Sequence, residues 1–176
     1  MVGDIFDGEG FVRGMLRNGG ALEGRSMPLV GAGGVGSAIA ASCAAAGVAK
    51  LALHDVNSAS ADALAGRLTR HYPELAVAVG SNDPAGFDIV VNATPMGMVA
   101  GDPMPVDVAR IAPSAFVGEV VLKQEVTAFL RAARALGCKT QVGADMLFEQ
   151  IPAYLEFFGF PATTPDELRR VAKIQY

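Results

Sequence analysis

The chain has 176 residues, which fits one domain, and its hydrophobic fraction of 51% supplies a buried core and excludes general disorder. Its formal net charge of -4, with no block of lysines and arginines, excludes a basic surface for nucleic acid and indicates a small-molecule ligand. The two cysteines and two histidines stand apart in the sequence, so we expect reduced, buried thiols and no metal site.

Residues 26–49 carry no charged side chain, and this stretch is long enough to suggest a membrane span. Pro28, the clustered glycines and the many small residues favour a strand, a turn and a helix instead. The N-terminal region, with Asp7 and Glu9, does not have the basic and apolar segments of a secretory signal. The sequence therefore predicts a cytoplasmic protein with no membrane contact.

The first elements are a helix and a βαβ unit. A short helix is predicted over residues 7–16, with Asp7 as its N-cap. The apolar run 27–30 predicts a strand, and the Ala-rich segment 37–46 predicts a helix that Gly47 ends. A second strand over 51–54 completes the unit.

Between the first strand and its helix, residues 31–36 read Gly-Ala-Gly-Gly-Val-Gly, the G-x-G-x-x-G pattern of dinucleotide-binding turns. Gly31 would permit the turn, Gly33 would let backbone approach a pyrophosphate, and Gly36 would let helix and strand pack closely. The amides at the helix start would face the phosphates. Asp55 lies about 20 residues further on, where a carboxylate accepts hydrogen bonds from the adenosine ribose. A purely structural turn is the alternative, because 21 residues are glycine.

The rest of the chain continues the alternation of strands and helices. Further strands are predicted over 75–79, 89–91, 115–121 and 139–142, and helices from Asn57 or Ser58 to residue 71, and over 127–136, 145–158 and 165–174. This order predicts an α/β fold, a Rossmann-type doubly wound and mainly parallel six-stranded sheet with helices on both faces. Residues 1–176 would form one dinucleotide-binding domain that includes the two C-terminal helices.

Residues 92–98, Asn-Ala-Thr-Pro-Met-Gly-Met, place a polar loop at the carboxyl edge of the sheet, where ligands bind in this architecture. Together with the glycine loop, residues 7–11 (Asp-Gly-Glu-Gly-Phe) and residues 143–150 (Gly-Ala-Asp-Met-Leu-Phe-Glu-Gln), this loop resembles the shikimate dehydrogenase family, including its quinate-using relatives. The order and spacing of all four motifs match. The resemblance covers the cofactor-binding half of the family and its returning C-terminal helix, whereas the family's N-terminal substrate domain has no counterpart in the 176 residues.

The resemblance implies roles for single residues. Asp7 matches an aspartate that hydrogen-bonds the substrate hydroxyl and partners a catalytic lysine, and Gln150 matches a glutamine that contacts the ring hydroxyls. A helix cap and an exposed helix residue are the alternatives. Thr94, Gly97, Met98, Met146 and Leu147 match positions that line the nicotinamide pocket. The expected cofactor-binding residues are Gly31, Ala32, Gly33, Gly34, Val35, Gly36, Asp55, Val56, Asn57, Ala93, Thr94, Pro95, Gly97, Met98, Val121, Gly143, Met146 and Leu147.

Some positions depart from the family pattern. Pro95 stands where the family usually has serine, Leu122 stands where a strand-end tyrosine usually reaches the substrate, and Ile5 and Phe6 replace the first two residues of an Asn-Thr-Asp motif. The lost hydroxyls put the substrate's identity in doubt. The family's catalytic lysine has no match either, because Lys50, Lys123, Lys139 and Lys173 are predicted on other elements.

The sequence therefore predicts an NAD-dependent shikimate/quinate dehydrogenase-like oxidoreductase domain, of the kind used in aromatic amino acid biosynthesis, that is inactive as this chain alone. A non-catalytic dinucleotide-binding or regulatory module is the alternative. NAD is expected rather than NADP, because Asp55 would repel a 2′-phosphate and residues 56–59 offer no arginine. The apolar helix 145–158 predicts a homo-oligomer or association with a separate substrate domain.

Overall fold

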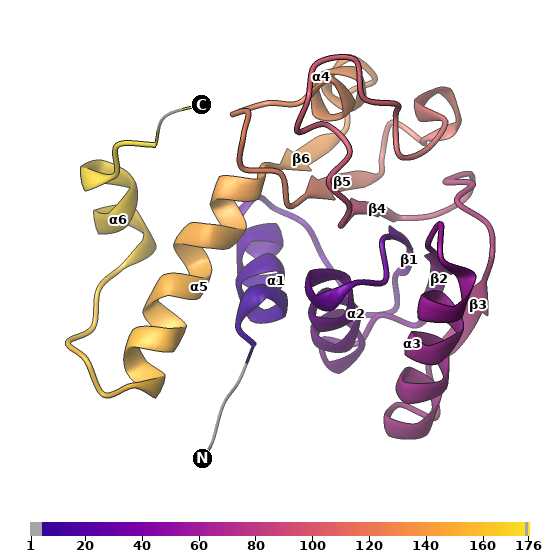
Figure 1. The fold of residues 1–176 in the computed structure, drawn as a ribbon, viewed down its shortest axis with the longest axis horizontal. Coiled ribbons are helices and arrows are strands. Elements are labelled where there is room, and N and C mark those ends of the chain that lie inside the picture. Colours follow the sequence, from indigo (N-terminus) through magenta and orange to yellow (C-terminus); the bar gives the residue numbers. More distant parts are fainter. Residues whose placement is uncertain (1–4, 175) are drawn as a thin grey trace.

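A computed structural model describes residues 5–174 and 176, so residues 1–4 and 175 of the predicted domain lie outside the described part. Its centre is a six-stranded sheet in the order β3-β2-β1-β4-β5-β6, in which every neighbouring pair is parallel (Figure 1). The strands are β1 (Ser26–Val30), β2 (Lys50–His54), β3 (Ala76–Val79), β4 (Ile89–Asn92), β5 (Phe116–Glu119) and β6 (Lys139–Gln141). This is the strand order of a doubly wound dinucleotide-binding fold, which confirms the predicted fold class.

Helices cover both faces of the sheet. They are α1 (Asp7–Arg17), α2 (Gly34–Ala45), α3 (Ser58–His71), α4 (Ala128–Ala135), α5 (Gly143–Phe157) and α6 (Pro165–Val171), with a short 3-10 helix η1 (Val108–Arg110). Alternate strand residues belong to different cores, because side chains alternate across a strand. Leu29 and Val91 pack with α1, α2 and α3, whereas Val30 and Val90 pack with η1 and α4. No helix within residues 5–174 is both long and apolar enough to cross a membrane.

The first helix lies between α2 and α5, and glycines allow both contacts (Figure 1). A Cβ atom on Gly8 would lie 2.2 Å from the Ala38 carbonyl oxygen of α2, and one on Gly10 would lie 2.6 Å from the Met146 carbonyl oxygen of α5. These distances are far below ordinary contact, so any larger residue would push the helices apart. The glycines of the 7–11 motif therefore have a packing role.

Several predicted boundaries need correction. Asp7 is the first residue of α1 and not its N-cap, because Phe6 occupies the capping position and no side chain caps the helix. The strand predicted over 115–121 ends at Glu119, and the last helix ends at Val171 rather than 174. Propensity patterns place element ends less accurately than element centres, because hydrogen bonding decides where a terminal turn ends.

Candidate dinucleotide site

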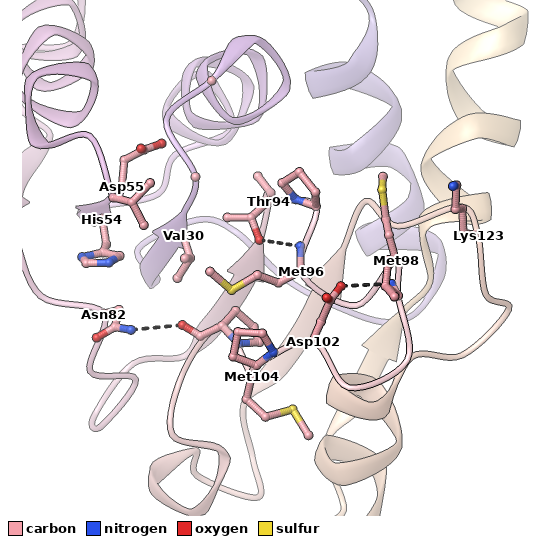
Figure 2. Close-up of a pocket in the computed structure, with 18 residues that line it drawn as sticks. Val30, His54, Asp55, Asn82, Thr94, Met96, Met98, Asp102, Met104 and Lys123 are labelled. Carbon is pink, nitrogen blue, oxygen red and sulfur yellow. Dashed lines mark hydrogen bonds between the residues drawn. The ribbon is translucent and has the colours of Figure 1, made fainter.

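A pocket of about 680 Å³ opens at the carboxyl ends of β1, β2 and β4 (Figure 2). The chain leaves β1 in one direction along the sheet and β4 in the other, so these ends form the topological switch point where open α/β sheets bind ligands. The pocket is lined by Val30, Gly31, Gly33, His54, Asp55, Val56, Asn82, Ala93, Thr94, Pro95, Met96, Met98, Val99, Asp102, Pro103, Met104, Pro105 and Lys123. Most of its lining is therefore apolar, with a few polar groups at the strand ends.

Each of the three fingerprint glycines, Gly31, Gly33 and Gly36, is required at its position for a different structural reason. Gly31 has a φ of +106°, which favours glycine, and a Cβ atom on Gly36 would lie 1.9 Å from the Gly31 carbonyl oxygen. A Cβ atom on Gly33 would meet nothing within 4 Å, although Gly33 lies on the pocket wall as the N-cap of α2. Gly31 and Gly36 thus shape the turn, whereas Gly33 leaves space where a ligand could approach.

The start of α2 offers backbone donors to that space. The first amides of a helix have no partner within it, and the positive end of the helix dipole favours an anion there. No side chain among the described residues caps α2, and Gly33 and Gly34 are exposed. The geometry fits a diphosphate, which would lie on these amides.

Asp55 connects the end of β2 to the glycine loop. Its Oδ2 atom accepts a hydrogen bond from the Ala32 amide at 2.7 Å, and its Oδ1 atom accepts one from the Asn57 amide at 2.8 Å. These hydrogen bonds lower the pKa of Asp55, and the one from Ala32 has the largest effect, so the carboxylate is charged at neutral pH. Each oxygen still has acceptor capacity for a ribose hydroxyl. Ala32 itself is nearly buried and contributes to the site by positioning Asp55.

The loop after β4 is fixed by its own polar side chains. Asn92 is fully buried, its Oδ1 accepts hydrogen bonds from the Thr94 amide and hydroxyl, and its Nδ2 donates to the Met96 carbonyl. The Asp102 carboxylate accepts hydrogen bonds from the Gly97 and Val99 amides, at 3.0 Å each. Figure 2 shows Met96 and Met98 beside the pocket, with the Met96 amide donating a hydrogen bond to the Thr94 hydroxyl. The loop is therefore a preformed wall.

The structure brings only part of the predicted cofactor set into this pocket. Gly31, Gly33, Asp55, Val56, Ala93, Thr94, Pro95 and Met98 line it. Ala32, Gly34, Val35, Gly36, Asn57, Gly97, Val121, Gly143, Met146 and Leu147 do not, although several of them support residues that do. Met146 is 5% exposed and belongs to the core between α1 and α5. Gly143 packs against the chain after β5, where its Cβ atom would lie 2.2 Å from the Val121 carbonyl oxygen.

Some residues that line the pocket were not predicted from the sequence. His54 and Asn82 lie on the side of Asp55, and the Asn82 amide donates to the Pro105 carbonyl at 3.1 Å. Lys123 also lines the pocket, although the sequence analysis did not include it among the expected cofactor-binding residues. Only their positions in the sequence could have indicated a role in the site, because each residue follows a strand end or lies in a loop that the strand order brings to this edge of the sheet.

Asp7 and Gln150 meet in a second hollow of about 380 Å³, beside the aromatic rings of Phe6, Tyr154 and Phe157. Burial and the nearby Asp7 carboxylate raise the pKa of Tyr154. The Oε1 atom of Gln150 is buried and has no hydrogen-bond partner within the described residues. This hollow therefore combines an acid, an unsatisfied amide and aromatic surface. No group of three or more metal-ligating side chains gathers anywhere in residues 5–174.

Comparison with known proteins identifies relatives of the chain. A quinate/shikimate dehydrogenase (NAD(+)) of Corynebacterium glutamicum is 40% identical over 159 residues, which cover 87% of this chain and 56% of that protein. A shikimate dehydrogenase (NADP(+)) of Streptomyces avermitilis is 36% identical over 151 residues, which cover 82% of this chain and 51% of the relative. Over most of its own length, the chain is similar in sequence to quinate/shikimate dehydrogenases. It spans about half the length of these two relatives, and no family model matches it.

Solved structures of quinate and shikimate dehydrogenases share the fold. Quinate dehydrogenase from Corynebacterium glutamicum in complex with NAD superposes with a TM-score of 0.84 at 36% identity, covering 96% of this chain and 61% of that one. Shikimate 5-dehydrogenase from Listeria monocytogenes, in complex with shikimate and NAD, superposes with a TM-score of 0.89 at 24% identity, over 96% and 63% of the two chains. The second likeness shows the fold alone.

Proposed function

We propose that the chain is the dinucleotide-binding part of an NAD-dependent dehydrogenase that acts on quinate, shikimate or a similar hydroxylated ring acid. The observation that carries the proposal is the open cradle at the start of α2, where Gly33 leaves space beside unpaired amides and charged Asp55. The names of the relatives supply the reaction class. A bound nicotinamide would supply the hydride acceptor or donor.

NAD fits the site better than NADP. A 2′-phosphate on the adenosine ribose would meet the Asp55 carboxylate, and the adjacent Val56 and Asn57 offer no cation. One relative is named for NAD(+) and another for NADP(+), so both cofactors occur among the relatives.

The residues of the chain would divide the remaining work. Pro95, Met96 and Met98 would exclude water from the nicotinamide, and Thr94 would keep their loop in place. Asp7 and Gln150 would face the substrate, with Asp7 as a partner in the proton transfer and Gln150 as a hydrogen-bonding group for ring hydroxyls. A non-catalytic nucleotide-binding module remains the second candidate, because Asp7 and the lining of the dinucleotide pocket belong to separate hollows.

Calorimetric titration of the chain with NAD tests the proposal. Gly33→Ala adds a methyl group into space that is open in the structure, so the variant keeps its stability but binds NAD at least about tenfold more weakly, because the methyl group blocks the diphosphate. Gly66→Ala is the matched control, since it lies in α3, also has open space and is not in the pocket. Equal NAD affinity in both variants would overturn the proposed site.

We further infer that copies of the chain associate through the C-terminal end of α5. The first helix covers one side of α5, but Ile5, Phe157, Phe158 and Phe160 stay between 40% and 65% exposed. Exposed aromatic surface of this kind marks interaction sites. Light scattering should therefore show species larger than a monomer, and Phe158→Ser should reduce them, whereas a monomer at high concentration would contradict the inference.

A further inference from the structure

Lys123 occupies one end of the dinucleotide pocket. Figure 2 shows it at the end where Met98 lies, away from His54 and Asp55. The neighbouring residues hold its backbone in place: Val121 is buried, and the Gln124 side chain donates a hydrogen bond to the Gly97 carbonyl at 2.8 Å. The ammonium group therefore extends from a fixed point on the pocket rim.

Lys123 is also the one lysine or arginine among the residues that line this pocket. The two carboxylates of the pocket are engaged with backbone amides, Asp55 with Ala32 and Asn57, and Asp102 with Gly97 and Val99. Within residues 5–174, Lys123 makes no hydrogen bond or ion pair. Its charge is therefore available to a ligand.

The direction in which the dinucleotide lies along the pocket determines which ligand reaches Lys123. On the proposed function, adenosine lies at Asp55, the diphosphate at Gly33 and the nicotinamide at residues 94–98, so the nicotinamide end faces Lys123. A substrate must place its reacting carbon on the nicotinamide. The substrates named for the relatives are ring carboxylates, which carry a negative charge at neutral pH.

We propose that Lys123 binds the carboxylate of the ring substrate and orients the ring over the nicotinamide. This inference rests on the proposed function and adds to it a residue that sets substrate class. An ammonium paired with a carboxylate at one end of the ring fixes which ring carbon faces the nicotinamide, because a ring held at one point has few remaining orientations. Uncharged ring alcohols would lack this contact.

Protection of lysines from acetylation tests the proposal on the chain as it exists. The chain is treated with acetic anhydride in four ways: without ligand, with saturating NADH, and with saturating NADH plus either quinate or the uncharged methyl ester of quinate. Peptide mass spectrometry then gives the acetylation rate of each lysine. We expect quinate to slow acetylation of Lys123 severalfold and the ester to leave it unchanged. Lys139 is the internal control, since it lies outside the pocket and donates to the Gly19 carbonyl.

A variant gives a second measurement. Lys123→Gln should weaken quinate binding to the NADH-loaded chain about tenfold, while Lys139→Gln leaves it unchanged. No protection of Lys123 by quinate, or equal protection by the ester, overturns the proposal. Full protection by NADH alone, with no further protection when quinate is added, also overturns it, because Lys123 would then contact the nucleotide and not the substrate. Failure of NADH itself to bind would instead overturn the proposed function.

Discussion

Glu119 makes the stability of the protein depend on pH. It ends β5 with no exposed surface, its Oε2 atom accepts a hydrogen bond from the Thr127 hydroxyl at 2.8 Å, and its Oε1 atom has no partner within the described residues. Burial raises the pKa of Glu119 from 4.5 to about 7. The folded protein therefore binds the carboxyl proton of Glu119 more tightly than the unfolded chain does. The stabilisation that this proton gives is complete below pH 4.5 and is lost as the pH rises through about 7.

The size of the effect follows from the two pKa values. Each unit of difference corresponds to about 1.4 kcal/mol, so ionisation of Glu119 lowers the free energy of unfolding by roughly 3 kcal/mol between mildly acidic and mildly alkaline pH. For a chain of this length, that equals a fall in Tm of roughly 6 to 12 °C. Glu119→Gln removes the ionisable group, retains an oxygen that can accept from Thr127, and should abolish this fall.

Urea unfolding of both proteins from about pH 5 to about pH 8 measures the difference. We expect the variant to gain stability relative to the wild type as the pH rises. Asp83→Asn is the control, because hydrogen bonds from Arg110 and Ala85 lower the pKa of Asp83, which therefore titrates below this range. Parallel curves for wild type and Glu119→Gln would refute the argument that burial controls this carboxyl.

Three further results are expected. Gly36→Ala should lower the free energy of unfolding by about 2 kcal/mol or more and weaken NAD binding, because its Cβ atom would lie 1.9 Å from the Gly31 carbonyl oxygen; a thermal melt that matches wild type would contradict this. Calorimetry should show tighter binding of NAD than of NADP. The Asp55→Ala variant should bind NAD more weakly than the wild type does, since it frees the Ala32 amide, and should show a smaller difference between the two affinities. Equal or tighter binding of NADP to the wild type would exclude the proposed preference for NAD. An NADH absorbance assay of the 176-residue chain with quinate or shikimate should give negligible turnover, because a positioned acid/base contributes roughly 10² to 10⁴-fold and a carboxylate such as that of Asp7 is a weak base toward an alcohol; robust turnover would identify another base.

The sequence was sufficient for the sheet and for the glycine turn. Continuous apolar runs such as 89–91 fit strands buried on both faces, and the fingerprint marks a βα turn by the positions of its glycines. Both signals are local, so they do not depend on the rest of the fold. The predicted Asp55 position belongs to the same unit and does line the pocket.

The composition of the pocket needed tertiary structure. Asn82, Asp102 and Lys123 come from three segments whose meeting depends on strand order, and no local pattern marks them. Met146 shows the opposite difficulty, because an apolar residue on an amphipathic helix suits a core as well as a pocket. The packing of α1 against α5 depends on the absence of a side chain at Gly10, so no hydrophobic pattern predicts it.

The position of α1 between α2 and α5 has a consequence for folding order. Asn18, at the end of α1, donates to Asp145 of α5, 127 residues further along the chain, and Arg17 pairs with Asp166, 149 residues along. During synthesis, β1 to β5 and the glycine turn emerge before any of these partners. Contacts between such distant segments form late, because the chain must first lose the conformational entropy of the long loop between them. The helix α1, although it is synthesised before the six strands, thus completes its packing last, and a ribosome-stalled chain ending before α5 would leave the side of α1 that carries Gly10 uncovered.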